Sequence, residues 1–138
     1  MTERERIQPA AIPESHRDLI ERPIIAALAT TLPDGTPQVT PVWFDFAGGY
    51  IFFNSARGRL KDRAVRTHPY VAIAMIDPQN PYRYLAIRGP VVEIAEQGAR
   101  DHIDLLARRY LGQEKYPGPA DEERVKYTVA PEYVTTMG

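Results

Sequence analysis

Residues 52–66 read Phe-Phe-Asn-Ser-Ala-Arg-Gly-Arg-Leu-Lys-Asp-Arg-Ala-Val-Arg and contain five basic side chains and one acidic one. The aromatic and β-branched run from Tyr50 to Phe53 predicts a strand. Asn54 and Ser55 can cap a helix, which we expect to run to about Thr67. The sequence therefore predicts a strand that leads through a capped turn into a short basic helix.

The basic side chains at the start of this helix predict a phosphate site, because free backbone N–H groups there attract an anion and cationic side chains strengthen the attraction. They are Arg57, Arg59, Lys61 and Arg63. The alternative is a solvated helix face, with Leu60 and Ala64 packed inward. Both interpretations stay open on these residues alone.

The spacing of Arg59 and Lys61 adds a condition to the phosphate hypothesis. Residues two apart on a regular helix point about 200° apart, so the two side chains converge only if the chain is still turning at Arg59. Gly58 permits such a turn, since glycine adopts backbone angles that other residues avoid.

The composition indicates one domain, because 138 residues are enough for a single core. The net charge of −1 gives no support for binding to nucleic acid or to an anionic membrane. The chain has no cysteine, and its three histidines, His16, His68 and His102, lack the spacing of a metal site, so we predict no metal and expect exposed helix histidines. No apolar run approaches the length of a membrane span, and the charged N-terminus lacks a signal-peptide core, which predicts a cytoplasmic protein.

Hydrophobic patterns predict about six strands, mostly antiparallel, with two or three helices. Pro41 indicates an edge strand, a bulge or a backbone turned toward a ligand, and Gly89-Pro90 indicates a bend or bulge. This mainly β pattern favours a small β-barrel over an open α+β sheet. Besides the elements above, we expect a loose arm (1–12), a helix (13–21), and strands at 24–31, 38–46, 70–77 (buried on both faces), 82–94 and 125–130.

One further helix is predicted by a clean apolar stripe near the end of the chain. Asp104 and Arg108 are expected to pair on its outer side. The stripe consists of Ala99, Ile103, Leu106, Ala107 and Tyr110.

Five segments, taken in order, resemble the split β-barrel family of flavin- and deazaflavin-dependent oxidoreductases, which has the pyridoxamine 5′-phosphate oxidase-like (PPOX-like) fold. The resemblance covers roughly residues 20–135. The segments are Ala27-Leu28-Ala29-Thr30, residues 35–44, residues 53–55 with 59–63, residues 68–72, and residues 82–89.

The short chain and the run from Pro81 to Gly89 are most similar to the branch that uses coenzyme F420, a deazaflavin. The resemblance implies a single split-barrel domain over residues 1–138. It also implies a homodimer with two cofactor sites at the dimer interface. The implied reaction is hydride transfer from reduced F420 to an electron-poor alkene, enone or quinone-like substrate.

The resemblance also implies the residues that bind the cofactor. Arg59 and Lys61 would hold its phosphate with Arg63 nearby. The reaction itself requires a proton from water or from a side chain, for which Tyr82 and Tyr84 are the candidates. The remaining members of the implied site are Gln38, Pro41, Val42, Trp43, Asn54, Ser55, Ile76, Asp77, Tyr82, Tyr84 and, where the family can place a basic residue of the partner chain, Arg124.

True pyridoxamine phosphate oxidases carry a C-terminal region with Arg and His residues for the substrate, and residues 132–138 contain neither. Oxidation of pyridoxamine phosphate is therefore not expected. The alternatives that remain are an FMN-binding oxidoreductase on the same barrel and a non-catalytic protein that binds a phosphorylated or tetrapyrrole ligand.

Overall fold

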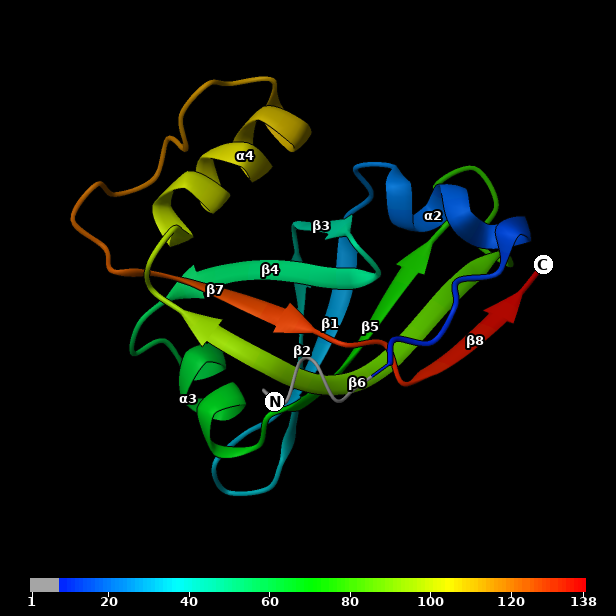
Figure 1. Cartoon of the computed structure of the whole chain (residues 1–138), viewed down its shortest axis with the longest axis horizontal. Helices are drawn as coiled ribbons and strands as arrows, with labels where there is room; N and C mark the ends of the chain where they lie inside the picture. Colours follow the sequence, from blue (N-terminus) through cyan, green and yellow to red (C-terminus); the bar gives the residue numbers. More distant parts are fainter. Residues whose placement is uncertain (1–7) are drawn as a thin grey trace.

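The computed structural model describes residues 8–138. Within them the chain forms eight strands, three α-helices and one 3₁₀ turn (Figure 1). In chain order these are η1 (Glu14–His16), α2 (Arg17–Glu21), β1 (Ala26–Thr31), β2 (Pro37–Val42), β3 (Phe44–Ala47), β4 (Tyr50–Ala56), α3 (Leu60–Thr67), β5 (Tyr70–Ile76), β6 (Tyr84–Ala95), α4 (Ala99–Leu111), β7 (Arg124–Val129) and β8 (Tyr133–Met137).

The strands form one antiparallel sheet in the order β2-β1-β5-β6-β7-β4-β3, with β8 paired to β6. Strand β6 joins the two halves, because residues 84–90 pair with β5 and residues 91–95 pair with β7. The register shifts between Val91 and Glu93, just after the predicted bend at Gly89-Pro90. The curled, mainly β sheet confirms the predicted split barrel (Figure 1).

Alternate side chains of the strands fill the interior between the two halves. Phe53 and Tyr127 stack at its centre with ring centroids 4.6 Å apart. Helix α4 packs on β7 and β4, and α3 packs on β1 and β4. The predicted apolar stripe of α4 faces the protein, since Ala99, Leu106 and Ala107 are almost fully buried.

The segment predicted as one strand over residues 38–46 is two strands, which corrects that expectation. Val42 pairs with Ala26 of β1, whereas Phe44 pairs with Phe53 of β4. Trp43 lies between the ladders, where the chain passes from one half of the sheet to the other. Pro41 does lie on an edge strand, as predicted, because β2 ends the sheet. Strand β8 was not predicted.

The predicted cap of the basic helix is also wrong. Asn54 and Ser55 belong to β4, and the carboxylate of Asp62 accepts the Gly58 backbone N–H at 2.9 Å instead. The predicted turn is present, since Gly58 has φ +85° and the backbone at Arg59 is extended before the helix begins at Leu60.

Several expectations about burial are wrong, because the burial of a side chain depends on the elements that pack against it. His16 and His102 are buried, whereas His68 is exposed as expected. Asp104 is buried and accepts the Tyr116 backbone N–H at 2.9 Å instead of pairing outside with Arg108. Strand β5 alternates buried and more exposed positions, and Leu60 is partly exposed while Ala64 is buried.

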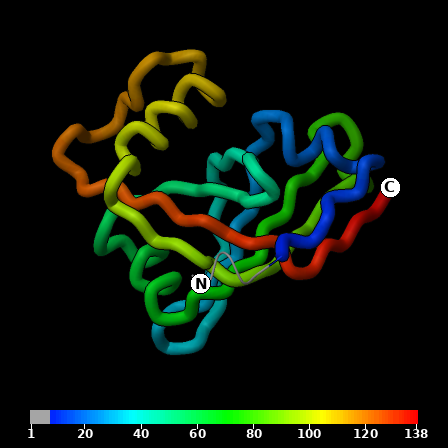
Figure 2. Tube along the Cα trace, in the orientation of Figure 1, coloured from blue at the N-terminus to red at the C-terminus, as the bar shows by residue number. Residues whose placement is uncertain are grey.

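Seven residues of the predicted arm lie outside the described residues. The rest of the arm runs beside the end of the chain (Figure 2). There Ala10 N–H donates to the Pro131 carbonyl at 2.8 Å, and Ile12 joins the core. Among the helices of residues 8–138, none has the length and apolar character that crossing a membrane requires.

Candidate functional site

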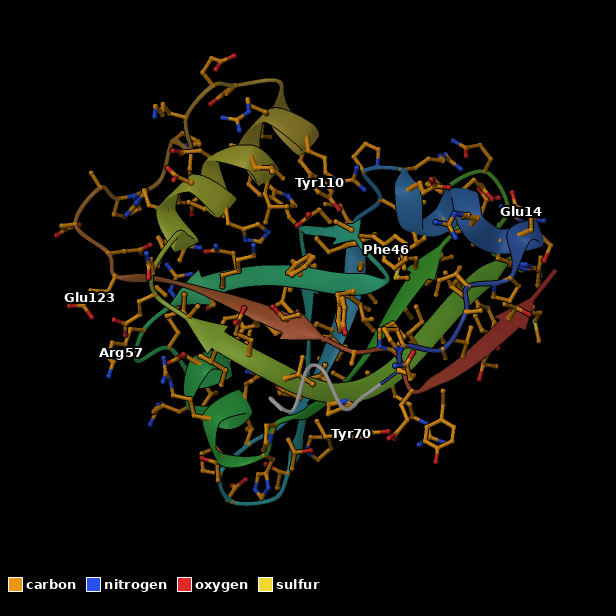
Figure 3. The ribbon with its side chains drawn as sticks, viewed as in Figure 1. Glu14, Phe46, Arg57, Tyr70, Tyr110 and Glu123 are labelled. Carbon is orange, nitrogen blue, oxygen red and sulfur yellow. The ribbon has the colours of Figure 1, made fainter. Side chains whose placement is uncertain are left out.

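Trp43 forms an aromatic wall at the split between the two halves of the sheet. Its ring stacks on Tyr110 of α4, with centroids 5.4 Å apart and planes 11° apart. The Tyr110 hydroxyl donates to the Ile24 carbonyl at 2.7 Å and accepts the Phe44 N–H at 3.2 Å. Tyr110 is therefore fixed between α4 and β3, as Figure 3 shows, and it holds the wall in place.

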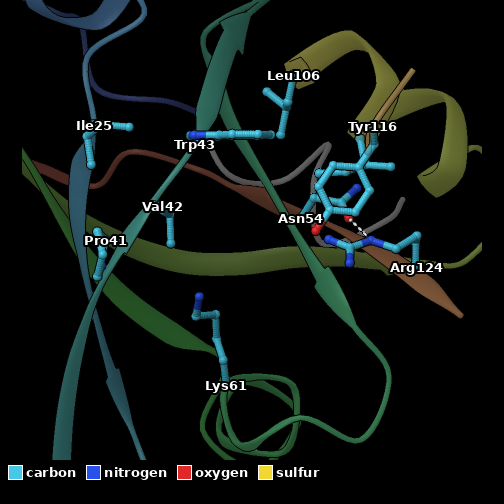
Figure 4. A pocket seen from close by; sticks show the side chains of 10 residues that line it. Ile25, Pro41, Val42, Trp43, Asn54, Lys61, Leu106, Tyr116 and Arg124 are labelled. Carbon is cyan, nitrogen blue, oxygen red and sulfur yellow. Dashed lines mark hydrogen bonds between the residues drawn. The ribbon is translucent and has the colours of Figure 1, made fainter. Parts of the chain in front are cut away.

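A cavity of about 340 Å³ lies against this wall. Its volume is in the range of small-molecule sites, about 300–1,000 Å³. One side is apolar, and the other carries two cations and an amide (Figure 4). Trp43 and nine further residues line it: Ile25, Pro41, Val42, Asn54, Lys61, Ile103, Leu106, Tyr116 and Arg124.

Lys61 projects into the cavity from the first turn of α3 (Figure 4). Burial, together with the charges of Arg59 and Arg124, lowers the pKa of Lys61. Among residues 8–138 no acidic side chain forms an ion pair with it. A half-buried ammonium beside other cations and without an acidic partner favours the binding of an anion.

Arg124 lies at the start of β7 and is almost fully buried. Its Nη1 donates to Glu122 Oε2 at 2.7 Å, and the other oxygen of Glu122 accepts from Arg59 Nη2 at 2.5 Å. Burial would raise the pKa of Glu122, but hydrogen bonds and charge from the two arginines lower it. Arg59 and Arg124 therefore share one carboxylate, and Lys61 lies near both arginines. The three cations leave a local excess of positive charge.

Tyr116 closes the cavity from the loop between α4 and β7. Its ring meets Trp43 edge-on at 6.2 Å, and the Arg124 guanidinium lies 5.0 Å from its centroid. The loop is held by Asp104, which accepts the Tyr116 N–H, and by Arg100, which donates to the Glu122 carbonyl at 2.9 Å. The Tyr116 side of the cavity is thus held by a fixed loop.

The structure brings six of the sequence-predicted residues together in this cavity: Pro41, Val42, Trp43, Asn54, Lys61 and Arg124. Arg124 reaches it within its own chain. Ile76 lies in a neighbouring apolar groove of about 280 Å³, which shares Ile25 and Pro41 with the cavity. Arg59 does not line the cavity, but its guanidinium donates to Glu122, the carboxylate that also binds the lining residue Arg124.

The other predicted residues lie away from the cavity in this chain. Arg63 is exposed on α3, and Tyr82, 78% exposed, precedes β6. Tyr84 is half-buried within β6. Ser55 is buried in β4, and Asp77 pairs with Arg83 at 3.0 Å. Gln38 of β2 keeps its Oε1 buried, and within residues 8–138 this atom has no hydrogen-bond partner.

Four lining residues were missed by the sequence analysis. Ile103 and Leu106 belong to the predicted stripe of α4, where they were assigned to the core. Ile25 precedes β1 with its side chain half exposed. Tyr116 carried a usable signal, because it is a single aromatic residue in the polar loop of residues 112–123.

Comparisons with known proteins agree with this architecture. A family model described as pyridoxamine 5′-phosphate oxidase matches residues 12–138. A solved structure described as an F420 reductase is 41% identical, with a TM-score of 0.82, over 90% of this chain and 98% of that one. No curated protein matches the chain.

More distant structures share the fold alone. A conserved hypothetical protein from Mycobacterium tuberculosis is 19% identical over 96% of this chain and 88% of its own, with a TM-score of 0.71. HupZ of Group A Streptococcus is 18% identical over 91% of this chain and 94% of its own, with a TM-score of 0.68.

Proposed function

The chain belongs to the pyridoxamine 5′-phosphate oxidase family, and from this premise we propose that it is an oxidoreductase that uses coenzyme F420. The observation that carries the proposal is the cavity itself. It combines the rigid Trp43 wall with a cationic end formed by Lys61 and Arg124. The 41% identity to a structure described as an F420 reductase supports the choice of F420.

The residues fit the two chemically different ends of such a cofactor. Lys61 lacks an acidic partner among the described residues, and Arg124 offers a buried guanidinium, so the cationic end suits a phosphate. Trp43, Val42 and Leu106 supply flat apolar surface for a tricyclic ring.

A bound reduced deazaflavin supplies the hydride. The residues of this chain would orient the ring against Trp43, exclude water with Ile103 and Leu106, and balance the phosphate charge with Lys61. Two lining groups carry a transferable proton, the Lys61 ammonium and the Tyr116 hydroxyl. Because Lys61 would be engaged by the phosphate, we assign proton delivery to Tyr116 Oη. The substrate we propose is an electron-poor alkene, enone or quinone-like compound.

Parallel titrations of the protein with F420 and FMN test this proposal. We expect F420 to bind at least about tenfold more tightly than FMN, and reduced F420 to be oxidised when a quinone is added. Tighter binding of FMN would favour the FMN-dependent alternative. Binding of F420 without oxidation by a panel of enones and quinones would favour a non-catalytic binding protein.

A further inference from the structure

His102 of α4 belongs to a hydrogen-bonded chain that ends at the cavity. Its Nε2 lies 2.6 Å from Asp45 Oδ1, and its Nδ1 lies 3.0 Å from Asn54 Nδ2. Asn54 Oδ1 accepts from Arg124 Nε at 2.9 Å, the contact drawn in Figure 4. Asn54 and Arg124 line the cavity, whereas His102 is buried behind them.

The donor and acceptor of each hydrogen bond in this network follow from its outer partners, Arg124 and the Ala99 carbonyl. Arg124 Nε can only donate, so the Asn54 atom facing it must be the oxygen. The Ala99 carbonyl can only accept, and it receives the Asn54 amide at 3.0 Å. The second amide hydrogen then points to His102, so Nδ1 must accept and Nε2 must carry the hydrogen that Asp45 receives.

We infer that His102 is a positioning residue that orients the Arg124 guanidinium toward the cavity by fixing the Asn54 amide. The identity of the anion that Arg124 would then meet rests on the proposed function. Without an acceptor at the place of Nδ1, the Asn54 amide loses one of the three hydrogen bonds that set its orientation. A turned amide would present its NH₂ group to Arg124 Nε, and two donors repel.

The other contacts of Arg124 show why the orientation of the Asn54 amide affects ligand binding. Glu122 holds Nη1, and the Tyr116 ring lies against the guanidinium plane. Within residues 8–138 Nη2 makes no hydrogen bond to the protein, which leaves it available to a ligand. Asn54 is the contact that sets the position of Nε, and thereby the direction of the whole planar group.

Two near-isosteric variants separate the two links of His102. His102→Asn places an oxygen where Nδ1 was and loses Asp45, whereas His102→Gln keeps a donor to Asp45 and loses the acceptor for Asn54. In calorimetric titration with F420, we expect H102N to bind within about threefold of the wild type. H102Q and H102F should bind about five- to tenfold more weakly, as expected for one lost hydrogen bond between neutral groups, here the Asn54 amide and His102 Nδ1.

A double-mutant cycle with Arg124→Ala tests whether the effect passes through Arg124. We expect R124A to weaken binding about tenfold and H102F to add nothing in that background. If R124A weakens binding but H102F does not, or if H102F costs as much in the R124A background, the inference is overturned while the proposed function stands. If the wild type binds no F420, the proposed function fails instead.

A ligand-free measurement decides the inference even then. In nitrogen-15 NMR spectra of the wild-type protein, we expect the neutral His102 ring to carry its hydrogen on Nε2 and the Arg124 Nε–H to be protected from exchange. That protection should persist in H102N and vanish in H102Q. A hydrogen on Nδ1, or equal protection in both variants, would overturn the assignment.

Discussion

At the scale of single residues, Lys61 differs from the other cations of its helix in what surrounds it. Lys61 faces the cavity without an acidic partner among the described residues, whereas Arg66 donates to Asp62 at 3.0 Å. Arg59 is held by Glu122. Arg63, two residues beyond Lys61, is exposed, as expected for side chains about 200° apart on a helix. A solvated helix face does not produce such a difference.

We therefore expect Lys61→Ala to weaken F420 binding by at least about tenfold, because a charge-assisted hydrogen bond contributes roughly 1.5–3 kcal/mol. Arg59→Ala should weaken it less, since Glu122 already engages the guanidinium. The matched control is Arg63→Ala, which should bind within about twofold of the wild type. Isothermal titration of the three variants measures this, and three equal dissociation constants would contradict it.

The lowered pKa of Lys61 adds a pH dependence. Phosphate binding requires the ammonium form, so affinity is highest below the pKa of Lys61 and falls as the pH rises through it. In a Lys61→Arg variant the guanidinium stays charged, so its affinity should stay level over the same range. Titrations from pH 7 to pH 10 compare the two proteins, and parallel curves would show that Lys61 is not the titrating group.

At the scale of elements, the start of α3 depends on the buried carboxylate of Asp62. This carboxylate accepts the Tyr127 hydroxyl at 2.5 Å, the Gly58 N–H at 2.9 Å and Arg66 Nε at 3.0 Å. Burial would raise the pKa of Asp62, but these hydrogen bonds outweigh it and lower the pKa below 3.8. Asp62 therefore fixes the turn from which Lys61 enters the cavity.

Asp62→Asn should lower the free energy of unfolding by about 2 kcal/mol at pH 7, the scale of hydrogen bonds to a charged group. Because the folded-state pKa is lowered, this stabilisation is present above pH 3.8 and is lost as the pH falls through the folded value. Urea unfolding measures this: the difference in the free energy of unfolding between wild type and variant should be smaller at pH 3 than at pH 7. Tyr127→Phe is the control: it removes one hydrogen bond to the same carboxylate, at a cost of roughly 1.5–3 kcal/mol, but keeps the ionisable group.

The sequence predicted correctly those elements whose conformation depends on residues close to them in the chain. The stripe of α4 and the Gly58 turn follow from periodicity and from backbone freedom, and both are present. The break at Trp43 depends on which distant strand each side of it pairs with, and no local pattern records that pairing. Strand β8 exists because β6 offers it an edge.

The candidate site, like the fold, was predicted only in part from the sequence. The cations and Trp43 stood out by residue type and by the family resemblance. The burial of His102 was not predictable, because Asp45 and Asn54, which satisfy its polar atoms, are 57 and 48 residues away. Long-range hydrogen-bond networks leave no periodic signal in a sequence.

At the scale of the whole molecule, one face of the β2-β1-β5 half is apolar and open. Ala27 lies opposite Pro41 and Ala74, so these residues share a face. Val39, 66% exposed, and Ile76, 48% exposed, flank them along the groove beside the cavity. A contiguous apolar face of this kind is typical of an interaction surface, and we propose that a second copy of the chain covers it.

Light scattering after gel filtration tests this proposal, with an expected mass of twice 15.6 kDa at micromolar concentration. Val39→Glu should dissociate the dimer, because burying an unpaired carboxylate in an apolar interface costs several kcal/mol. Leu105→Glu is the matched control, since Leu105 is an exposed leucine on α4 that lines neither the groove nor the cavity. Because the groove and the cavity share Ile25 and Pro41, the dissociated V39E protein should also bind F420 more weakly than L105E. A wild-type monomer of normal thermal stability would contradict the proposed dimer, and a V39E monomer with undiminished affinity would show that each cavity is complete within one chain.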